Sequence, residues 1–592
     1  MPPISPPSGT STSSPSGSTG GPVWIYPTIE PALARRITQE LHLHPVTAQL
    51  LVSRGFTNME EIPPFIYAKL PDLFDPFLMI DMSAAVRRIH EAIKGGEGIL
   101  IYGDNDVDGM TGTALLHEFL MSVGAKVFFH LPNRSDLSTT LMSQALSTAQ
   151  GKQCSLVITV DCGITAAKEI ATVVEKGIDV IVTDHHEPTA KIPLCVATLN
   201  PKLVNNTYPN RELTGVGVAF KLAHALTSHL IRVGQIERGS VDLKSLLDLV
   251  ALGTVADMGA LVGENRILVR YGLEVLRGMK RVGLKKLFEV CDLGSGDVSA
   301  NALASKIAPR LNSLGRIADP VKGVELLLIR DPIAAEQLAK ELDLNNIERQ
   351  KIEQVMAEDV ALRLINEPEV LDDKAIIMAS SNWHPGIIAI VTTWIAKLHH
   401  RPTCMIAITD GVGKGSIRTI REFPLLPLLK ENSDLLLNFG GHDYAAGLSL
   451  REENIPEFRR RFIAKANMSL SDNDVVSKLV IDARADFDEI TFDLMESLQL
   501  LEPHGNENPP PILYTDAKQI RPPRVVGGAH LKFYLRQGDR QLEGIAFGMA
   551  DRRSELAQRD GELSLRIAFT PQVNTFQNKL SIQLLIRDFI VL

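Results

Sequence analysis

Short apolar runs alternate with longer helical stretches in the first half of the chain. The runs lie near 98–103, 126–130, 155–161 and 178–183, and helix-forming stretches such as 112–123 separate them. Strands that alternate with helices predict a parallel sheet with helices on both faces. Sites in such sheets form beyond the carboxyl ends of the strands, where three of these runs end in acidic or histidine residues. We therefore expect an α/β domain with a site along one edge of its sheet.

The rest of the chain divides by composition and periodicity. Pro, Ser, Thr and Gly make up almost all of residues 1–22, which predicts a disordered tail. The helical stretches before the first strand are assigned, with the sheet, to one domain over 23–331. A long charged helix over 332–365 then leads to a second α/β domain over 366–470. Short strands separated by turns predict a small β-barrel over 471–592.

Length and composition are those of a globular protein with two to four domains. The chain has 592 residues, of which 45% are hydrophobic and 22% are charged. Its net charge of −9 argues against coating nucleic acid by charge alone. The five cysteines are scattered without a C-x-x-C pair, so they support neither a zinc ribbon nor a disulfide framework, and their odd number predicts a reducing compartment. We see neither a membrane-length apolar run nor a secretory signal, so we expect a cytoplasmic protein without a membrane partner.

The sharpest chemical signal directly follows the first apolar run. There the chain reads Tyr102-Gly103-Asp104-Asn105-Asp106-Val107-Asp108-Gly109. Aspartates at every second position would point to one side of an extended segment. Three like charges that close repel one another unless a cation lies between them. The motif therefore predicts a site for hard divalent ions, and such a site usually serves phosphate chemistry.

Three further motifs place an acid or an imidazole at the end of an apolar run that we assign to a strand. They are Ile158-Thr159-Val160-Asp161, Ile181-Val182-Thr183-Asp184-His185-His186 and Leu252-Gly253-Thr254-Val255-Ala256-Asp257. A lone Asp after a strand is usually a turn or N-cap residue, and a lone His pair is more often structural. Together, however, the four motifs supply ligands for two divalent ions. Mixed Asp and His ligation suits Mn²⁺, with Mg²⁺ as a substitute, and two such ions can generate hydroxide and stabilise phosphoryl charge.

The order of these motifs resembles the DHH phosphoesterase superfamily. Within it, three further segments are similar to the RecJ family of single-strand exonucleases: Gly215-Val216-Gly217-Val218-Ala219-Phe220-Lys221, Glu264-Asn265-Arg266-Ile267-Leu268, and Ala308-Pro309-Arg310-Leu311-Asn312-Ser313-Leu314-Gly315-Arg316. Segments in the second α/β domain resemble the DHH-associated domain: Trp383-His384-Pro385-Gly386-Ile387, Gly413-Lys414-Gly415-Ser416-Ile417-Arg418 and Gly440-Gly441-His442. The resemblance covers about residues 25–592 and implies that the C-terminal barrel is an OB-fold.

The resemblance also implies an activity and a set of site residues. It implies hydrolysis of single-stranded DNA from the 5′ end by two Mn²⁺ or Mg²⁺ ions, in recombination and repair. The implied metal ligands are Asp104, Asp106, Asp108, Asp161, His185 and Asp257. The implied catalytic contacts to phosphate come from His186, Arg310, Asn312 and His442, with Asp184 orienting an imidazole. The implied substrate-binding residues are Arg134, Lys414, Ser416, Arg418, Gly440 and Gly441, of which Ser416 and Arg418 would hold the 5′-terminal phosphate.

Glycines are expected in such a site for a physical reason. A glycine has no side chain, so its backbone amide can approach a phosphate closely. The alternative for the Gly413–Ser416 run is a plain hairpin turn. The segment after Arg134 departs from the family, since Ser135–Leu141 replaces a Gly-Tyr-Gly-Leu pattern. That departure concerns the substrate contacts around Arg134 and leaves the metal ligands in place.

The barrel segment has local basic character. Its cations are Lys518, Arg521, Arg524, Lys532, Arg536, Arg540, Arg552 and Arg553, and Phe533 and Tyr534 lie among them. This composition suits a groove that follows a DNA backbone while bases stack on the rings. A solvated charged face over core aromatics is the alternative.

The expected partner is a DNA single strand with a 5′ end, threaded between the two α/β domains of a monomer. A helicase and a single-strand-binding protein are candidate protein partners by resemblance. Two other functions stay open. One is a DHH enzyme for short oligonucleotides or cyclic dinucleotides, against which the barrel and the chain length argue. The other is a non-catalytic single-strand-binding scaffold, against which the complete ligand set argues.

Overall fold

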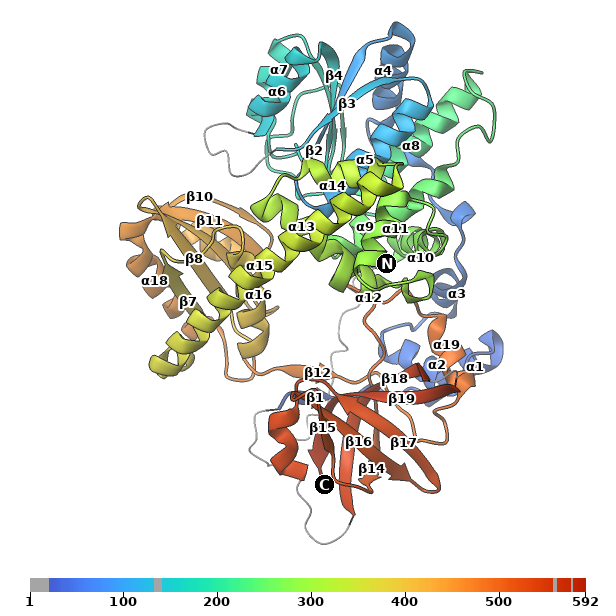
Figure 1. The fold of residues 1–592 in the computed structure, drawn as a ribbon, viewed down its shortest axis with the longest axis vertical. Coiled ribbons are helices and arrows are strands. Elements are labelled where there is room, and N and C mark those ends of the chain that lie inside the picture. The colour runs from blue at the N-terminus through green and yellow to red at the C-terminus, as the bar shows by residue number, and fades with distance from the viewer. Residues whose placement is uncertain (1–20, 133–140, 557–561, 577–578) are drawn as a thin grey trace. The chain divides into compact units, whose positions relative to one another are not determined.

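A computed structural model describes residues 21–132, 141–556, 562–576 and 579–592 (Figure 1). The chain forms two compact units. One comprises Lys69–Val475, and the other combines Met1–Ala68 with Val476–Leu592. Most of the expected tail, residues 1–20, lies outside the described residues. No helix in the described ranges combines the length and the apolar character that crossing a membrane requires.

The first sheet is parallel and has the strand order β3-β2-β4-β5-β6. Its strands are β2 (Gly98–Gly103), β3 (Lys126–His130), β4 (Cys154–Val160), β5 (Asp179–Thr183) and β6 (Ala197–Leu199). The four strands expected from the sequence are confirmed. The three-residue strand β6 was missed because so short a run carries no periodicity.

Helices cover both faces of this sheet, because alternate side chains of each strand point to opposite sides. Ile99 and Ile101 of β2 belong to a core shared with α4 (Met82–Gly95), α5 (Val107–Ser122) and α8 (Gly215–Arg232). Leu100 and Tyr102 belong to a separate core with α6 (Leu141–Gly151) and α7 (Ala167–Glu175). The first core continues into a helical region that carries α9 (Leu247–Ala256), α10 (Gly263–Arg277), α11 (Val282–Val290), α12 (Ala300–Ala302), α13 (Ala308–Ile317) and α14 (Val321–Leu328).

The long helix α15 (Pro332–Asn366) joins this region to a second sheet (Figure 1). It begins where the Asp331 carboxylate accepts a hydrogen bond from the Ala334 amide at 2.8 Å, with proline in the first turn. Ala339 is buried in the core of the first sheet, and Val360 is buried in a core of the second. The expected connecting helix is confirmed, one residue longer than its sequence assignment.

The second sheet is mixed, with the order β10-β11-β9-β8-β7. Its strands are β7 (Ile376–Ser380), β8 (Thr403–Thr409), β9 (Val412–Arg418), β10 (Leu436–Gly441) and β11 (Ala445–Arg451), and only β7 and β8 pair in parallel. α16 (Ile388–His399) packs on one face with the core that includes Met378. α17 (Leu425–Glu431) and α18 (Ile455–Ser469) pack on the other with Ile377.

The second unit is built on a closed barrel. Its strands follow the order β14 (Leu513–Gln519), β18 (Leu563–Phe576), β19 (Lys579–Val591), β17 (Arg540–Ala546) and β16 (His530–Gln537), and β16 pairs back onto β14. The short strands β13 (Ala483–Arg484) and β15 (Arg524–Val526) extend the same sheet, while β1 (Val23–Ile25) pairs with β12 (Lys478–Val480). The expected C-terminal barrel is confirmed.

The N-terminal helices belong to this barrel unit. α1 (Pro31–Leu41), α2 (Pro45–Ser53) and α3 (Ile62–Tyr67) share a hydrophobic core with α19 (Phe492–Gln499) and the barrel. The buried Arg54 guanidinium donates to both Asp482 carboxylate oxygens, at 2.8 and 3.0 Å. The prediction that these helices belong with the first sheet in one domain over 23–331 is wrong. Local periodicity finds a helix but not its packing partner, which here lies more than 400 residues further along the chain.

Candidate metal centre

The three aspartates after β2 lie where the chain turns from strand to helix. Asp104 follows the strand, Asp106 is the N-cap of α5, and Asp108 lies in its first turn. The Asp106 carboxylate accepts a hydrogen bond from the Gly109 amide at 3.1 Å, which is the usual N-cap geometry. The prediction of an extended segment was therefore wrong. The aspartates alternate as in a strand, but the Asp106 cap with Gly109 decides the local structure. The helix therefore begins at Val107, five residues earlier than expected.

Asp161 and Asp184 directly follow the neighbouring strands β4 and β5. The Asp104 amide donates to the Val160 carbonyl at 3.0 Å, and the Asp161 amide donates to the Thr183 carbonyl at 2.9 Å. The parallel ladder thus continues one residue past each strand and aligns these residues along one edge. Asp161 has a φ of 60°, a left-handed backbone conformation that a non-glycine residue rarely adopts.

Asp257 reaches the same edge from a helix, so the prediction that it ends a strand was wrong. The apolar run before it forms α9, and Asp257 is the C-cap. This helix is buried on all sides, and a short apolar run does not distinguish a buried helix from a buried strand.

The six expected metal ligands lie together. Side-chain ligand atoms within 4.8 Å of one another form three overlapping groups: Asp104, Asp106 and Asp161; Asp108, His185 and Asp257; and Asp161, His185 and His186. The His185 Nε2 atom lies 3.1 Å from the Asp161 Oδ1 atom and 3.5 Å from Asp257 Oδ2. Asp161 Oδ1 and His185 Nε2 are buried, and no described residue forms a hydrogen bond with either atom. Such a pair of facing acceptor atoms fits a bound cation.

The electrostatics of the cluster fit divalent ions as well. Burial raises the pKa of Asp108 and Asp161 well above the ordinary range, and the neighbouring carboxylates raise both further. Burial and Asp106 raise the pKa of Asp257 to about 7. Burial lowers the pKa of His185 to about 3, so its imidazole is neutral and can act as a ligand. Carboxylate oxygens with a neutral imidazole form a donor set suited to Mn²⁺, with Mg²⁺ as a substitute.

Backbone amides and glycines hold the acidic groups in place. The Asp108 carboxylate accepts hydrogen bonds from the Gly215 and Val216 amides at the start of α8, at 2.6 and 2.9 Å. A Cβ atom on Gly215 would lie 2.5 Å from the Asp161 Cβ. Sequence reasoning used Gly215 only for the family resemblance and missed this role. A glycine at a helix start carries no signal of which carboxylate it faces.

His186 belongs to the third of the ligand groups, with Asp161 and His185, and its hydrogen-bond partner there is Asp184. Its Nδ1 lies 2.7 Å from Asp184 Oδ1, as expected for an acceptor that orients an imidazole. Burial alone would lower the pKa of His186, but the hydrogen bond and charge of Asp184 raise it to about 9. The raised pKa favours the protonated ring in the metal-free fold.

The second sheet brings His442 to the same place. The His442 ring lies parallel to the His186 ring, with the centroids 6.3 Å apart. His442 follows β10, an exposed edge strand that ends at Gly440 and Gly441. Gly441 has a φ of 136°, and a Cβ there would lie 2.4 Å from the Ala445 carbonyl oxygen. Only glycine fits this turn.

The two residues expected to contact phosphate from α13 differ in their surroundings. Asn312 Oδ1 accepts a hydrogen bond from the Val107 amide at 3.2 Å, so it lies at the start of α5 beside the aspartates. Arg310 instead donates to the Asp343 carboxylate of α15 at 2.8 Å and to the Lys306 carbonyl at 2.7 Å. The structure therefore joins Asn312, but not Arg310, to the metal cluster by a hydrogen bond. Arg134 lies outside the described residues.

Lys414, Ser416 and Arg418 lie on β9, a strand paired on both sides. The Gly413–Ser416 run is therefore neither a phosphate-binding loop nor the hairpin turn, which falls at residues 410–411. Arg418 Nη1 donates to Ser416 Oγ at 3.2 Å and to the Ile417 carbonyl at 2.8 Å. Burial lowers the pKa of Arg418, and no described carboxylate pairs with it. A half-buried guanidinium without a carboxylate partner is suited to an anionic ligand.

Lys202 is a cation that sequence reasoning missed. Its Nζ lies 3.2 Å from the Glu187 carboxylate, in the residue directly after His186. The buried Asn200 side chain donates to the His186 carbonyl at 2.9 Å and accepts from the Lys202 amide at 2.8 Å. Lys202 follows a strand too short to be predicted, so the sequence does not show that it lies beside His186.

In the barrel unit, Tyr534 of β16 lies near two cations. The Arg521 guanidinium lies 5.3 Å and the Lys532 ammonium 5.6 Å from its ring centroid. Phe533, by contrast, is fully buried in the barrel core. Several expected basic residues are engaged in ion pairs: Lys518 and Arg536 with Glu562, Lys532 with Glu543, Arg540 with Asp488, and Arg552 with Glu555 and Asp588. Of the two aromatic residues expected to stack on bases, only Tyr534 is therefore available, with Arg521 and the paired Lys532 near its ring.

Comparison with known proteins assigns a class to this fold and site. The family described as "DHH family, N-terminal domain" matches residues 98–254, "DHHA1 domain" matches 372–468, and "RecJ OB domain" matches 481–588. The chain is thus a DHH-family protein with a DHHA1 domain and an OB domain. A single-stranded-DNA-specific exonuclease RecJ from Dickeya dadantii is 36% identical over 574 residues, which cover 94% of this chain and 98% of the relative. The chain belongs to the RecJ family.

Further relatives agree with this assignment. RecJ from Bacillus subtilis is 36% identical over 558 residues, covering 94% of this chain and 69% of that protein. The crystal structure of RecJ in complex with Mn²⁺ from Thermus thermophilus has a TM-score of 0.79 and 30% identity over 96% of this chain and 79% of that one. The Mg²⁺ complex from the same organism has a TM-score of 0.74 and 28% identity over 96% of this chain and 78% of that one.

Proposed function

We propose that this protein is a single-strand-specific 5′→3′ exodeoxyribonuclease that hydrolyses phosphodiester bonds with two divalent ions. The observation that carries the proposal is the convergence of six carboxylate and imidazole ligands in three overlapping groups, in a chain of the RecJ family. The relatives' own names state that they act on single-stranded DNA. A cytoplasmic role in recombination and repair, with a helicase and a single-strand-binding protein as partners, is part of the proposal and rests on the family.

The acidic cluster can hold two ions. Asp104, Asp106 and Asp161 would hold one, and Asp108, His185 and Asp257 would hold the other. Asp161 lies between the two groups, since its Oδ1 is also 3.1 Å from His185 Nε2. When bound, the ions would lower the pKa of a water molecule and neutralise charge on the attacked phosphate.

The protein's own groups would position that phosphate. Asp184 raises the pKa of His186 to about 9, which favours the protonated ring, and that ring can donate a hydrogen bond to a phosphate oxygen. His442 approaches from the second sheet with its ring parallel to that of His186. Asn312 fixes the start of α5, and therefore the positions of Asp106 and Asp108, through its bond to the Val107 amide.

The 5′ polarity would come from β9 of the second sheet. Arg418 and Ser416 form a polar pair without a described carboxylate partner, which suits a terminal phosphate dianion. Tyr534 of the barrel, with Arg521 and Lys532, would stack on a base further along the strand.

The decisive experiment uses one single-stranded oligonucleotide labelled at either end. The full-length protein is incubated with each substrate in Mn²⁺, in Mg²⁺ and in EDTA. We expect immediate release of a labelled mononucleotide from the 5′-labelled strand, late release from the 3′-labelled strand, and no release in EDTA. A duplex of the same sequence should resist digestion. Early release of label from the 3′ end would refute the proposed 5′→3′ polarity. Turnover of dinucleotides but not of long strands would refute the proposed exonuclease activity.

A further inference from the structure

A large cavity lies at the opposite ends of two helices that carry metal-site carboxylates. It has a volume of about 1050 Å³ and is lined by the last turns of α5 and α10, the start of α9, the first residues of α11 and the segment after α14. Glu118 on its wall is ten residues along α5 from Asp108, a distance of about 15 Å at 1.5 Å per residue. Asp248 is nine residues along α9 from Asp257, or about 14 Å. The cavity is therefore separate from the metal centre.

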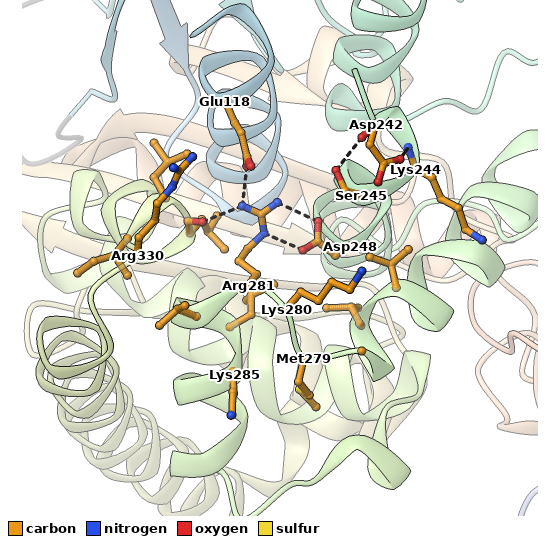
Figure 2. Close-up of a pocket in the computed structure, with 18 of the residues that line it drawn as sticks. Glu118, Asp242, Lys244, Ser245, Asp248, Met279, Lys280, Arg281, Lys285 and Arg330 are labelled. Atoms are coloured by element: carbon orange, nitrogen blue, oxygen red, sulfur yellow. Dashed lines mark hydrogen bonds and ion pairs between the residues drawn. The ribbon is translucent and has the colours of Figure 1, made fainter. Parts of the chain in front are cut away.

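Arg281 lies in the middle of this cavity and ties the two helices together. Figure 2 shows its guanidinium between Glu118 of α5 and Asp248 of α9. It bonds Glu118 at 2.7 Å, Asp248 at 2.7 and 3.2 Å, and the Leu327 carbonyl at 3.0 Å. The single charge of this guanidinium offsets one of the two carboxylate charges that face the cavity centre.

Four other cations around the cavity have no ion-pair partner in the part of the chain that the structure describes. They are Lys244, Lys280, Lys285 and Arg330, all exposed and labelled in Figure 2. The remaining acids of the lining are Asp242, which caps the turn at Lys244, and Glu274 on the rim. Over the whole lining five cations face four acids, and the four cations other than Arg281 are the ones without an ion pair among the described residues. The cavity is therefore suited to an anion.

The wall between these cations is apolar. Met121, Val275, Met279, Val282 and Leu328 contribute to the lining. A ligand that matches both features has a phosphate for the cations and a flat, weakly polar ring for the apolar wall. Nucleotides have this combination, and the volume is ample for one.

We infer that this cavity is a second nucleotide-binding site, which takes a phosphate-bearing nucleotide at a distance from the metal centre. The inference rests on the cavity and its unpaired cations, and it holds whether or not the proposed nuclease activity is correct. Lys280 and Lys285 contact the phosphate, and the base lies on the apolar wall. Arg281 joins α5, which carries Asp108, to α9, which ends at Asp257. The ligand therefore also lies beside the contact between these two helices.

The test is equilibrium binding of dAMP to the full-length protein in EDTA, which keeps metal ions from contributing. Lys280→Glu with Lys285→Glu is compared with a matched double variant, Lys94→Glu with Lys176→Glu. Those two lysines are also exposed, and they lie at the ends of other helices of the same domain. Arg418→Ala removes the proposed 5′-phosphate contact in the second sheet. Unchanged melting temperatures establish that the variants are folded.

We expect the Lys280/Lys285 variant to lose one bound dAMP per chain, with at least tenfold weaker binding at this site. The Lys94/Lys176 and Arg418 variants should keep this site, and deoxyadenosine, which lacks the phosphate, should not bind it. Wild-type binding by the Lys280/Lys285 variant, or equal loss in both double variants, would overturn the inference. So would loss of all dAMP binding in Arg418→Ala, or binding of deoxyadenosine as tight as that of dAMP.

Discussion

The imidazole rings of His186 and His442 lie almost parallel, with centroids 6.3 Å apart and planes inclined by 10°. His186 follows β5 of the first sheet, and His442 follows β10 of the second, more than 250 residues later. The pair therefore marks where the second sheet meets the metal centre. Two imidazoles side by side could both reach a single phosphate, so the proposed function would give the DHHA1 domain a part in the chemistry as well as in binding.

Replacing His442 should test that part directly. We expect His442→Ala to lower kcat on single-stranded DNA by about 10²–10³, because a donor to the developing charge is lost. KM should change little, since most of the strand is bound elsewhere. Leu437→Ala, an exposed residue of the same hairpin, should behave as wild type. An unaltered kcat in His442→Ala would remove this residue from the mechanism.

The pKa of Asp257 predicts a pH-dependent response to metal. In the metal-free fold, this pKa is raised from 3.8 to about 7, mainly by burial. Between these values the folded state binds more protons than the unfolded state, so Asp257 makes the metal-free protein less stable as the pH rises. Bound Mn²⁺ offsets the unfavourable charge of the ionised Asp257 carboxylate. At low pH, however, Mn²⁺ must compete with a proton for this carboxylate. The gain in melting temperature on adding Mn²⁺ should therefore be larger at pH 8 than at pH 5.5.

Thermal unfolding in EDTA and in Mn²⁺ measures this response. Asp257→Asn should reduce the pH dependence of the gain, because the titrating carboxylate is gone. A gain that is the same at both pH values would contradict the raised pKa.

Asp161 should be indispensable, because it lies between both groups of ligands. We expect Asp161→Ala to lower the rate of cleavage by at least about 10³-fold in Mn²⁺. Its melting temperature in EDTA should not fall, because the substitution removes a buried charge from a repulsive cluster. The matched variant Asp539→Ala, at an exposed turn of the barrel, should cleave normally. Retained activity in folded Asp161→Ala would contradict the assignment of the metal centre.

The sequence predicts four of the five strands of the first sheet and the six acidic and imidazole side chains that cluster beside it, but not how each side chain is held. Strands β2 to β5 could be predicted because their apolar runs end in turn residues. Asp108 and Asp257 were assigned to extended segments, yet both lie at helix ends, because capping and burial decide the local structure where the apolar pattern does not. Gly215, Asn200 and Lys202 could not be predicted, since their roles depend on which distant residue each one faces.

The Arg418–Ser416 pair predicts how the enzyme would discriminate between 5′ ends. We expect Arg418→Ala to lower the preference for a 5′-phosphate over a 5′-hydroxyl by about 10-fold or more, because a charge-assisted hydrogen bond is worth roughly 1.5–3 kcal/mol. The rate on 5′-hydroxyl strands should change much less. Competition between the two substrates in one reaction measures the preference, and Arg451→Ala on the neighbouring strand is the control. An unchanged preference would exclude Arg418 from recognition of the 5′ end.

Tyr534 predicts the contribution of the barrel to binding. Its ring centroid lies 5.3 Å from the cationic group of Arg521 and 5.6 Å from that of Lys532, so a base that stacks on it would also lie near these two side chains. Loss of one base–aromatic stack costs about 1–3 kcal/mol, so Tyr534→Ala should weaken binding of a long single strand by roughly 5- to 150-fold. Tyr534→Phe keeps the ring and should bind nearly as wild type. Fluorescence anisotropy in EDTA measures binding without cleavage, and all three proteins should cleave a dinucleotide equally. If Tyr534→Ala binds the long strand as tightly as the wild type, the base-stacking surface of the barrel lies elsewhere.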